Sequence, residues 1–240
     1  PMQMFASLIK DQSAKASKKM FHVAVMPCTG KKFEAARDEF KEDGVPNVDA
    51  VLTTQELIRM IKESGIVFSE LEPEAIDMPF GTISGAGLIF GVTGGVTEAV
   101  LRRVVSNKSR SALMTVANSG QRGMDGVKEF DLTYGDKNLH IAVVSGLNNA
   151  ESVIKRMKNG EKFDFIEVMA CPGGCICGGG QPFAMAEERA ERGRGLYDAD
   201  RLLSIRRAEE NPIIDSLYSD IIKGKVHKLL HVDYVKGDKK

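Results

Sequence analysis

The sequence predicts an α/β fold, in which mostly parallel sheet is flanked by helices and the C-terminal segment is helical. Short β-branched, apolar runs alternate with longer segments of helical character, which is the pattern of parallel strands with covered faces. Two of these runs lead directly into cysteines. The composition, 42% hydrophobic and 28% charged, is that of an ordinary globular protein. Whether the chain forms one domain or two lobes with a metal site between them stays open.

The first half of the chain contains two expected strands and three expected helices. Residues 20–26 (MFHVAVM) read as a buried strand that ends at Pro27 and Cys28. Thr53, with Glu56 three residues later, predicts a capping box at the start of a helix. A glycine-rich stretch at residues 84–95 precedes the third helix. The expected strands are residues 20–26 and 48–52, and the expected helices are residues 31–40, 53–63 and 96–105.

The second half begins with a predicted hairpin and ends with predicted helices. Residues 127–134 and 139–145 read as two strands around a turn at Gly135 and Asp136. A helix at residues 150–159 is expected to stop at Gly160. A strand at residues 163–169 (FDFIEVM) then runs into a cysteine loop at residues 171–182. The remaining predicted helices are residues 198–210 and residues 212–222, the latter starting at Pro212.

The bulk properties exclude some classes of partner. Lysine plus arginine equals aspartate plus glutamate, at 33 each, so a nucleic-acid backbone is not an expected partner. No apolar run approaches the roughly 18 residues of a membrane span. We expect residues 1–183 to form the α/β portion with both cysteine loops, and residues 184–240 to form a helical segment that packs on it.

The four cysteines are spaced like metal ligands rather than like a disulfide framework. Cys171, Cys175 and Cys177 fall within seven residues, and Cys28 lies far upstream. A chain of this size needs no disulfides to hold a core, so reduced thiols in the cytoplasm are the expectation. Several thiolates at one site select a soft metal. The paired C-x2-C units of structural zinc sites are absent, which favours iron–sulfur.

Both cysteine segments follow the carboxyl end of a predicted strand. Ligands of open α/β sheets gather in the crevice at those ends, so the two segments can meet despite their distance in sequence. The glycines of residues 173–180 would let the backbone approach a bulky cluster and would point amides at anionic sulfur. Pro27 and Pro172 stiffen the two corners. A plain tight turn would explain the glycines but not the thiols.

Two of these segments resemble signatures of the [FeFe]-hydrogenase family. Residues 25–34 (VMPCTGKKFE) are similar to the second signature, M-P-C-x-x-K-x-x-E, and residues 167–182 (EVMACPGGCICGGGQP) resemble the third, E-x-M-A-C-x-x-G-C-x-x-G-G-G-Q-P. Residues 85–95 resemble the glycine-rich segment between them. Residues 227–231 (HKLLH) and Tyr234 resemble the family's C-terminal end.

The resemblance implies a hydrogen-activating iron cluster, the H-cluster. Cys28, Cys171 and Cys175 would ligate its [4Fe–4S] half, and Cys175 would bridge to a two-iron subcluster carrying CO, cyanide and an azadithiolate. The implied reaction is the reversible two-electron reduction of protons to H2. Ferredoxin or upstream iron–sulfur domains would carry the electrons, and hydrogenase maturation proteins would be further partners.

Other residues take roles in the same resemblance. Lys31 would hydrogen-bond a cyanide ligand, since an ammonium is a natural partner for a buried anionic acceptor. Met26, Pro27, Phe90 and Met169 would line the two-iron pocket. The structural alternatives, which need no cofactor, are that Lys31 pairs with Glu34 one helical turn away and that both methionines are core residues. Cys177 is extra to the motif, and we expect a small buried side chain there rather than a ligand.

The sequence departs from the family at two places. The first signature, T-S-C-C-P, supplies the fourth cluster ligand in the family, and it is not found in this chain. Pro1 falls where the family resumes after that signature, so we expect the motif in a preceding segment and expect the chain alone to be inactive. Thr97 stands where the family pattern has methionine.

Three other functions compete with the hydrogenase. An iron–sulfur assembly protein of the nuclear-prelamin-binding type shares the cysteine framework without the two-iron centre, although Pro182 and the spacing of residues 29–31 favour the hydrogenase. A sensory hydrogenase-like module is the second. A dinucleotide-binding enzyme is the third, but Gly85, Gly87 and Gly91 miss the G-x-G-x-x-G spacing by one residue.

Overall fold

The computed structural model describes residues 1–75, 77, 83–105, 109–118, 120–123, 126–134 and 137–232. The predicted turn at Gly135 and Asp136, and Tyr234, lie outside these residues. Contacts divide the chain into two compact units: residues 1–77, 180–182 and 215–240 form the first, and residues 78–179 and 183–214 form the second. The boundary that we expect between residues 183 and 184 stays a prediction.

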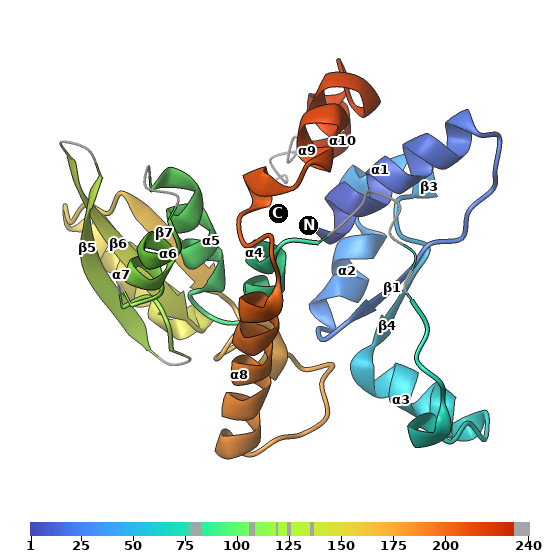
Figure 1. The fold of residues 1–240 in the computed structure, drawn as a ribbon, viewed down its shortest axis with the longest axis horizontal. Helices are drawn as coiled ribbons and strands as arrows, with labels where there is room; N and C mark the ends of the chain where they lie inside the picture. Colours follow the sequence, from blue (N-terminus) through green and yellow to red (C-terminus); the bar gives the residue numbers. More distant parts are fainter. Residues whose placement is uncertain are drawn as a thin grey trace, which may run out of the picture. The chain divides into compact units, whose positions relative to one another are not determined.

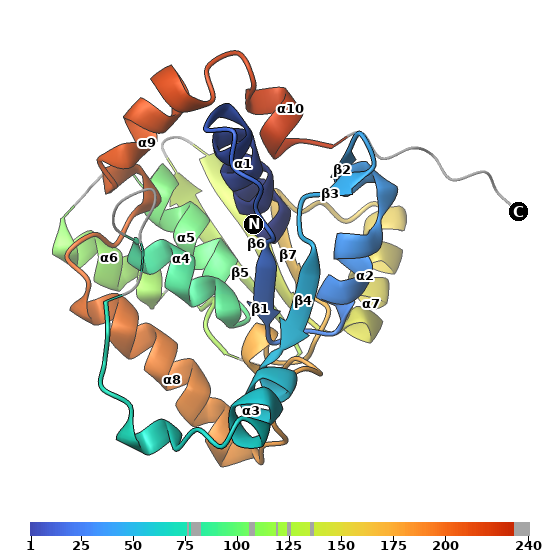
Figure 2. The ribbon, with the colours of Figure 1, turned by 90° about the vertical axis from the view of Figure 1, so that its right-hand side faces the viewer.

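The first unit is built on a parallel strand pair. Strands β1 (Val23–Met26) and β4 (Ala50–Thr53) lie side by side and are joined through helix α2 (Gly30–Ala36) (Figure 2). Because strand residues alternate between faces, Ala24 and Val51 share one buried face. They pack there against Met2 and Ala6 of helix α1 (Met2–Lys15). The core of this unit is therefore the helix–strand layer that ends at the Cys28 corner.

Short elements complete the first unit. Helix α3 (Thr54–Glu63) begins at the predicted capping box, in which the Thr53 hydroxyl accepts from the Glu56 amide at 3.2 Å and the Glu56 carboxylate accepts from the Thr53 amide at 2.8 Å. That prediction is confirmed. Two 3₁₀ turns (Asp38–Phe40 and Phe68–Glu70) and two short strands, β2 (Lys41–Glu42) and β3 (Val45–Pro46), also belong to this unit. Near the C-terminus it contains a π-helical turn (Leu217–Ile221) and helix α10 (Val226–Leu230). Helix α9 (Ile213–Ser216) is divided between the two units.

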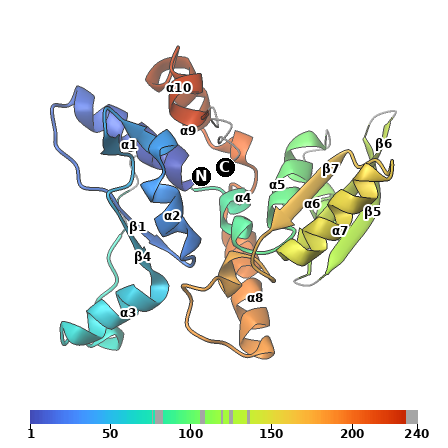
Figure 3. The same ribbon diagram turned by 180° about the vertical axis from the view of Figure 1, so that it is seen from behind.

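The second unit contains a three-stranded mixed sheet with helices on both faces (Figures 1 and 3). Strands β5 (Val127–Tyr134) and β6 (Lys137–Ser145) form the predicted antiparallel pair, and β7 (Phe165–Met169) runs parallel to β6. Alternate residues of β6 face opposite layers. Ala142 and Val144 pack against helix α7 (Leu147–Lys158), whereas Ile141 packs against helices α5 (Gly95–Val104) and α6 (Arg110–Ala117). The α/β fold class is confirmed.

The last large helix of this unit docks through a glycine. Helix α8 (Ala186–Leu202) packs on α4 (Gly85–Leu88), the 3₁₀ turn Ile89–Gly91 and the 3₁₀ turn Cys175–Cys177. A Cβ on Gly193 would lie 3.4 Å from Ile176 Cδ1, so a side chain there would press on the cysteine loop. After α8, a 3₁₀ turn at Ala208–Glu210 follows.

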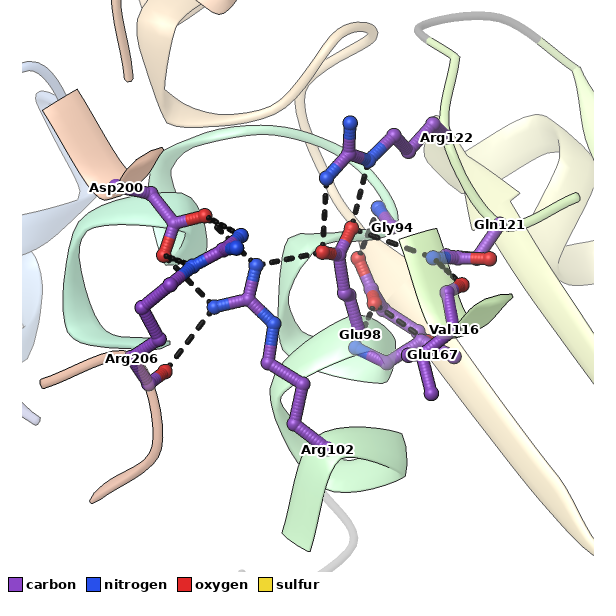
Figure 4. A network of polar contacts seen from close by, with 10 residues as sticks. Gly94, Glu98, Arg102, Val116, Gln121, Arg122, Glu167, Asp200 and Arg206 are labelled. Atoms are coloured by element: carbon purple, nitrogen blue, oxygen red, sulfur yellow. Dashed lines mark hydrogen bonds and ion pairs between the residues drawn. The ribbon is translucent and has the colours of Figure 1, made fainter. Parts of the chain in front are cut away.

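A buried charge network joins α8 to α5 (Figure 4). The Arg102 guanidinium donates to Asp200 at 2.8 Å on both oxygens and to Glu98 at 2.6 Å, and all three side chains are fully buried. Burial alone raises the pKa of Glu98, but hydrogen bonds and charge from Arg122 and Arg102 outweigh it and hold that pKa below its usual 4.5. Burial also raises the pKa of Asp200, but the hydrogen bonds and charges of Arg102 and Arg206 outweigh it, so that pKa is lowered. Both carboxylates are thus held in their charged form.

Some sequence-based boundaries were wrong. The helix expected at residues 198–210 corresponds to α8, which begins at Ala186 and ends at Leu202. The helix expected at residues 31–40 ends at Ala36, because Arg37 is extended with ψ near 143°. Helices α1 and α6 were not predicted. Within the described residues, no helix has the length and apolar character needed to cross a membrane.

Arg102→Gln should destabilise the protein strongly. The change leaves Asp200 and Glu98 buried with too little positive charge, which typically costs about 3–5 kcal/mol. Arg59→Gln is the control, because Arg59 pairs with Glu63 at the surface, where the loss should be no more than about 1 kcal/mol. Urea unfolding measures both. Equal losses in the two variants would contradict this account.

Candidate metal centre

The Cys28 corner lies in the first unit, directly after strand β1. Met26 pairs with Thr53 of the parallel strand, so Cys28 follows the carboxyl ends of both strands, as predicted. Its side chain is half-buried. A Cβ on Gly30 would approach Cys28 Sγ to 3.3 Å, so the glycine keeps the space next to the sulfur open.

Gly180, from the end of the cysteine-rich signature, is built into the same corner. Its amide donates to the Pro27 carbonyl at 3.0 Å, and its carbonyl accepts from the Gln55 amide at 3.0 Å. A Cβ on Gly180 would lie 2.9 Å from Thr53 Cβ and 3.0 Å from the Cys28 nitrogen. Only glycine therefore fits this close approach.

The other three cysteines lie in the second unit, in the loop after strand β7. Cys171 follows the carboxyl end of β7, where Met169 pairs with Ser145 of parallel strand β6. Gly173 and Gly174 both adopt positive φ, at 86° and 91°. The Gly173 amide donates to Ser145 Oγ at 3.0 Å. None of the four cysteines of the chain is in a disulfide.

The cysteine loop packs tightly against the turn formed by residues 91–97. The Thr93 amide donates to the Gly173 carbonyl at 3.4 Å. A Cβ on Gly174 would come within 2.8 Å of the Gly91 oxygen and the Thr93 nitrogen. From the other side, Arg192 of α8 donates to the Ile176 carbonyl at 3.2 Å. The loop is therefore held on one side by close backbone contacts and on the other by a side-chain hydrogen bond from Arg192.

A buried carboxylate holds this turn in place. Glu167 of β7 is 5% exposed and accepts from the Gly94 amide at 2.7 Å and from both the amide and the hydroxyl of Thr97 at 2.6 Å (Figure 4). Methionine, expected at residue 97 from the family pattern, has no hydroxyl to donate. The departure at Thr97 thus supplies a hydrogen bond to Glu167.

The remaining predicted site residues divide between the two units. In the first, Met26 and Pro27 precede Cys28, and Lys31 follows it on α2, where its ammonium pairs with Glu34. The Lys31–Glu34 ion pair, the structural alternative to a role in cofactor binding, is therefore present. Lys31 and Glu34 also line a cavity of about 720 Å³, together with residues of α1 and the segment around α10.

In the second unit, Met169 ends strand β7 and Phe90 sits in the 3₁₀ turn that precedes Gly91. Both side chains are half-buried. Phe90 therefore lies on the segment that contacts the cysteine loop, while Met169 directly precedes that loop. The pocket-lining role of both residues stays a prediction.

The residues of the second unit fit an iron–sulfur cluster on three counts. Reduced cysteines supply soft ligands. The Gly174 cradle fixes the loop between Cys171 and Cys175. Finally, the Thr93 hydroxyl is 2% exposed and has no hydrogen-bond partner in the part of the chain that the structure describes. A cluster sulfur at the adjacent cysteine loop would give this buried donor an acceptor.

Sequence reasoning missed the roles of Glu167 and Thr93. The acidic residue inside the otherwise apolar strand FIEVM was a usable signal, because a buried carboxylate needs donors. Thr93 gave no such signal, since a threonine in a glycine-rich turn is unremarkable in sequence.

A different group of possible metal ligands lies on the hairpin and on the segment after α7. Glu129, His140 and Glu161 place one ligand atom each within 4.8 Å of one another. Arg156 already donates to both carboxylates. The arginine supplies the positive charge that a metal ion would bring, so this cluster is read as an ion-pair network on the surface.

Comparison with known proteins places the chain among hydrogenases and their relatives. The family model for the iron only hydrogenase large subunit, C-terminal domain, matches residues 1–179, and the model for the iron hydrogenase small subunit matches residues 186–237. An NADP-reducing hydrogenase subunit of Solidesulfovibrio fructosivorans is 43% identical, and iron hydrogenase 1 of Clostridium pasteurianum is 38% identical, each over 98% of this chain. The chain spans 42% and 44% of these relatives, less than half of their length.

Two further similarities bear on function. The structure of an apo [FeFe]-hydrogenase variant from Chlamydomonas reinhardtii matches with a TM-score of 0.74 at 34% identity, covering 99% of this chain and 69% of that one. The cytosolic iron–sulfur assembly component 3 of Mus musculus is 33% identical over 98% of this chain and 52% of its own length. Two functional classes therefore share this framework.

Gly174→Ala should disrupt the cysteine loop and lower iron binding. The new Cβ would meet backbone atoms at 2.8–2.9 Å and would also sit at φ 91° and ψ −166°, a backbone region that is open almost only to glycine. Gly160→Ala is the control for positive φ alone: it has φ 98° but no atom within 4 Å of the added Cβ, so it should lose only about 1–2 kcal/mol. Thermal unfolding and iron content after reconstitution measure the difference. A Gly174 variant that behaves like the Gly160 variant would refute the packing argument.

Proposed function

The chain belongs to the iron-only hydrogenase large-subunit family, and on that premise we propose that it is part of an [FeFe]-hydrogenase that interconverts H2 with protons and electrons. The observation that carries the proposal is that both thiol-bearing signatures follow the carboxyl ends of parallel strands. Two of the hydrogenase relatives are 43% and 38% identical to the chain, whereas the mouse assembly component is 33% identical.

We propose Cys28, Cys171 and Cys175 as ligands of the [4Fe–4S] half of the H-cluster, with Cys175 bridging to the two-iron subcluster. The chain connectivity supports this assignment. Gly180 is hydrogen-bonded beside Cys28, and Cys175 is five residues earlier in the chain. Five residues span at most about 18 Å, a limit that the covalent chain sets by itself. When bound, such a cluster supplies an iron position at which protons are reduced.

The surrounding residues would shape the site in three ways. Met26, Pro27, Phe90 and Met169 offer apolar or soft surface that excludes water. Lys31 offers an ammonium to an anionic ligand such as cyanide, in exchange for its ion pair with Glu34. The glycines of the cysteine loop hold the thiolates in fixed positions through the backbone.

The proposal extends to partners and location. Ferredoxin or iron–sulfur domains elsewhere in the polypeptide would exchange electrons with the cluster, and maturation proteins would install the two-iron part. The cysteine spacing suits a reducing compartment, and we propose the cytoplasm. One relative is a hydrogenase subunit whose name says that it reduces NADP; the electron carrier of the present protein is a separate question.

The second candidate function is cytosolic iron–sulfur assembly. The specific observation in its favour is that the assembly component matches 98% of this chain, so its similarity includes both cysteine corners. This function would use the same thiols to hold an iron–sulfur cluster without a two-iron subcluster.

One experiment separates the two functions. The complete polypeptide is produced together with hydrogenase maturation proteins, and its infrared spectrum and H2 evolution are measured with a chemical reductant and a redox mediator. A hydrogenase should give bands of CO and cyanide bound to iron and should release H2. An iron–sulfur cluster without those bands and without H2 would reject the proposal in favour of the assembly function.

Cys175→Ser should abolish the CO and cyanide bands and H2 turnover in the matured polypeptide, because serine does not provide the bridging thiolate. Cys177→Ser, two residues further on, is the matched control and should retain both. The measurements are infrared spectra and H2 evolution per iron–sulfur cluster. Unchanged turnover in the Cys175 variant would refute its assignment as the bridging ligand.

A further inference from the structure

The hydroxyl of Thr93 is a buried donor that nothing in the described part of the protein accepts. The residue is 2% exposed, and its Oγ1 has no hydrogen-bond partner there. Leaving such a group unpaired costs folding free energy, so unsatisfied buried hydroxyls call for an explanation. The position of Thr93 supplies one.

Thr93 lies at the contact between the glycine turn and the cysteine loop. Its amide donates to the Gly173 carbonyl, and the next amide, that of Gly94, donates to Glu167. The backbone of Gly174 passes so close that a Cβ on it would lie 2.8 Å from the Thr93 nitrogen. Thr93 is thus fixed beside the two glycines that separate Cys171 from Cys175.

The acceptor that a bound iron–sulfur cluster would bring to this position is sulfur. Gly173 and Gly174 lie between two proposed ligands, Cys171 and Cys175. The sulfides of a cluster and the thiolates that bind it are anionic hydrogen-bond acceptors. Hydrogen bonds to the sulfurs of iron–sulfur clusters are among the factors that set their reduction potential. A donor favours the reduced form, because that form carries the additional negative charge.

We propose that the Thr93 hydroxyl donates a hydrogen bond to a sulfur of the cluster held by Cys171 and Cys175, and that it thereby raises the reduction potential of that cluster. In this assignment Thr93 contacts the cluster and sets its potential for electron transfer. The assignment rests on the proposed function only in requiring an iron–sulfur cluster at this loop. It holds for the hydrogenase and for the assembly protein alike.

The test compares three variants of the complete polypeptide with its [4Fe–4S] cluster reconstituted from iron and sulfide. Thr93→Val keeps the shape and removes the donor, and Thr93→Ser keeps the donor. Tyr197→Phe removes another buried hydroxyl that has no partner among the described residues, but Tyr197 lies over Arg122 rather than at the cysteine loop. The measurements are iron content, thermal unfolding, and a redox titration followed by electron paramagnetic resonance.

The expected result is specific to the donor. Thr93→Val should bind a full cluster and shift its midpoint potential to a more negative value, by about 59 mV for a tenfold change in a one-electron equilibrium. Thr93→Ser and Tyr197→Phe should keep the parent potential. An unchanged potential in a fully loaded Thr93→Val variant would overturn the assignment, with a buried water as the alternative acceptor.

Failure of the proposed function would look different. If the parent polypeptide incorporates no iron–sulfur cluster, both the cluster assignment and the role of Thr93 fall together. If clusters load but CO and cyanide bands never form, the hydrogenase proposal fails while the titration still decides the role of Thr93. A Thr93→Val variant that only unfolds at lower temperature, with the same potential, would make the residue structural.

Discussion

The carboxylate of Glu167 joins the strand that leads to Cys171 with the turn against which the cysteine loop packs. It accepts three hydrogen bonds at 2.6–2.7 Å, two of them from backbone amides. A buried carboxylate with donors of this kind is firmly placed, because losing one donor would leave charge unsatisfied in a low-dielectric interior. The Glu167 carboxylate thereby fixes Gly94 and Thr97, the residues on either side of the start of α5, and so the turn that contains Thr93.

The cysteine loop is rich in glycine and is still held in one shape. Glycine makes the unfolded chain more flexible, which costs conformational entropy on folding. Here the cost is offset by contacts made through the backbone itself: Gly173 to Ser145 and to Thr93, and Gly174 against Gly91. Rigidity at the cysteines comes from close approach of main chain to main chain.

The sequence predicted the parts of the structure that depend on local patterns. The strands before Cys28 and Cys171 were recognisable because apolar β-branched runs are short and end at turn residues. The capping box at Thr53 was recognisable because its two bonds are local. The resemblance to known signatures then linked these corners to a metal site.

The misplaced elements depend on contacts that are distant in sequence. Helix α8 has few apolar residues and contains Gly193 and Gly195, which weakens the helical pattern. Its position is fixed by the close approach of Gly193 to Ile176 and by the ion pair of Asp200 with Arg102. The orphaned hydroxyl of Thr93 could not be foreseen for the same reason, since burial is a property of the folded chain.

The Arg102–Asp200 pair crosses from the part of the chain matched by the large-subunit model to the part matched by the small-subunit model. Gly85 reinforces that junction, because any Cβ there would lie 1.9 Å from the Asp200 carboxylate. In a protein made as two polypeptides, such a guanidinium would keep Glu98 of its own helix but would meet the Asp200 carboxylate only after association. Covalent continuity makes that encounter intramolecular, with a high effective concentration, and needs no additional contact to do so.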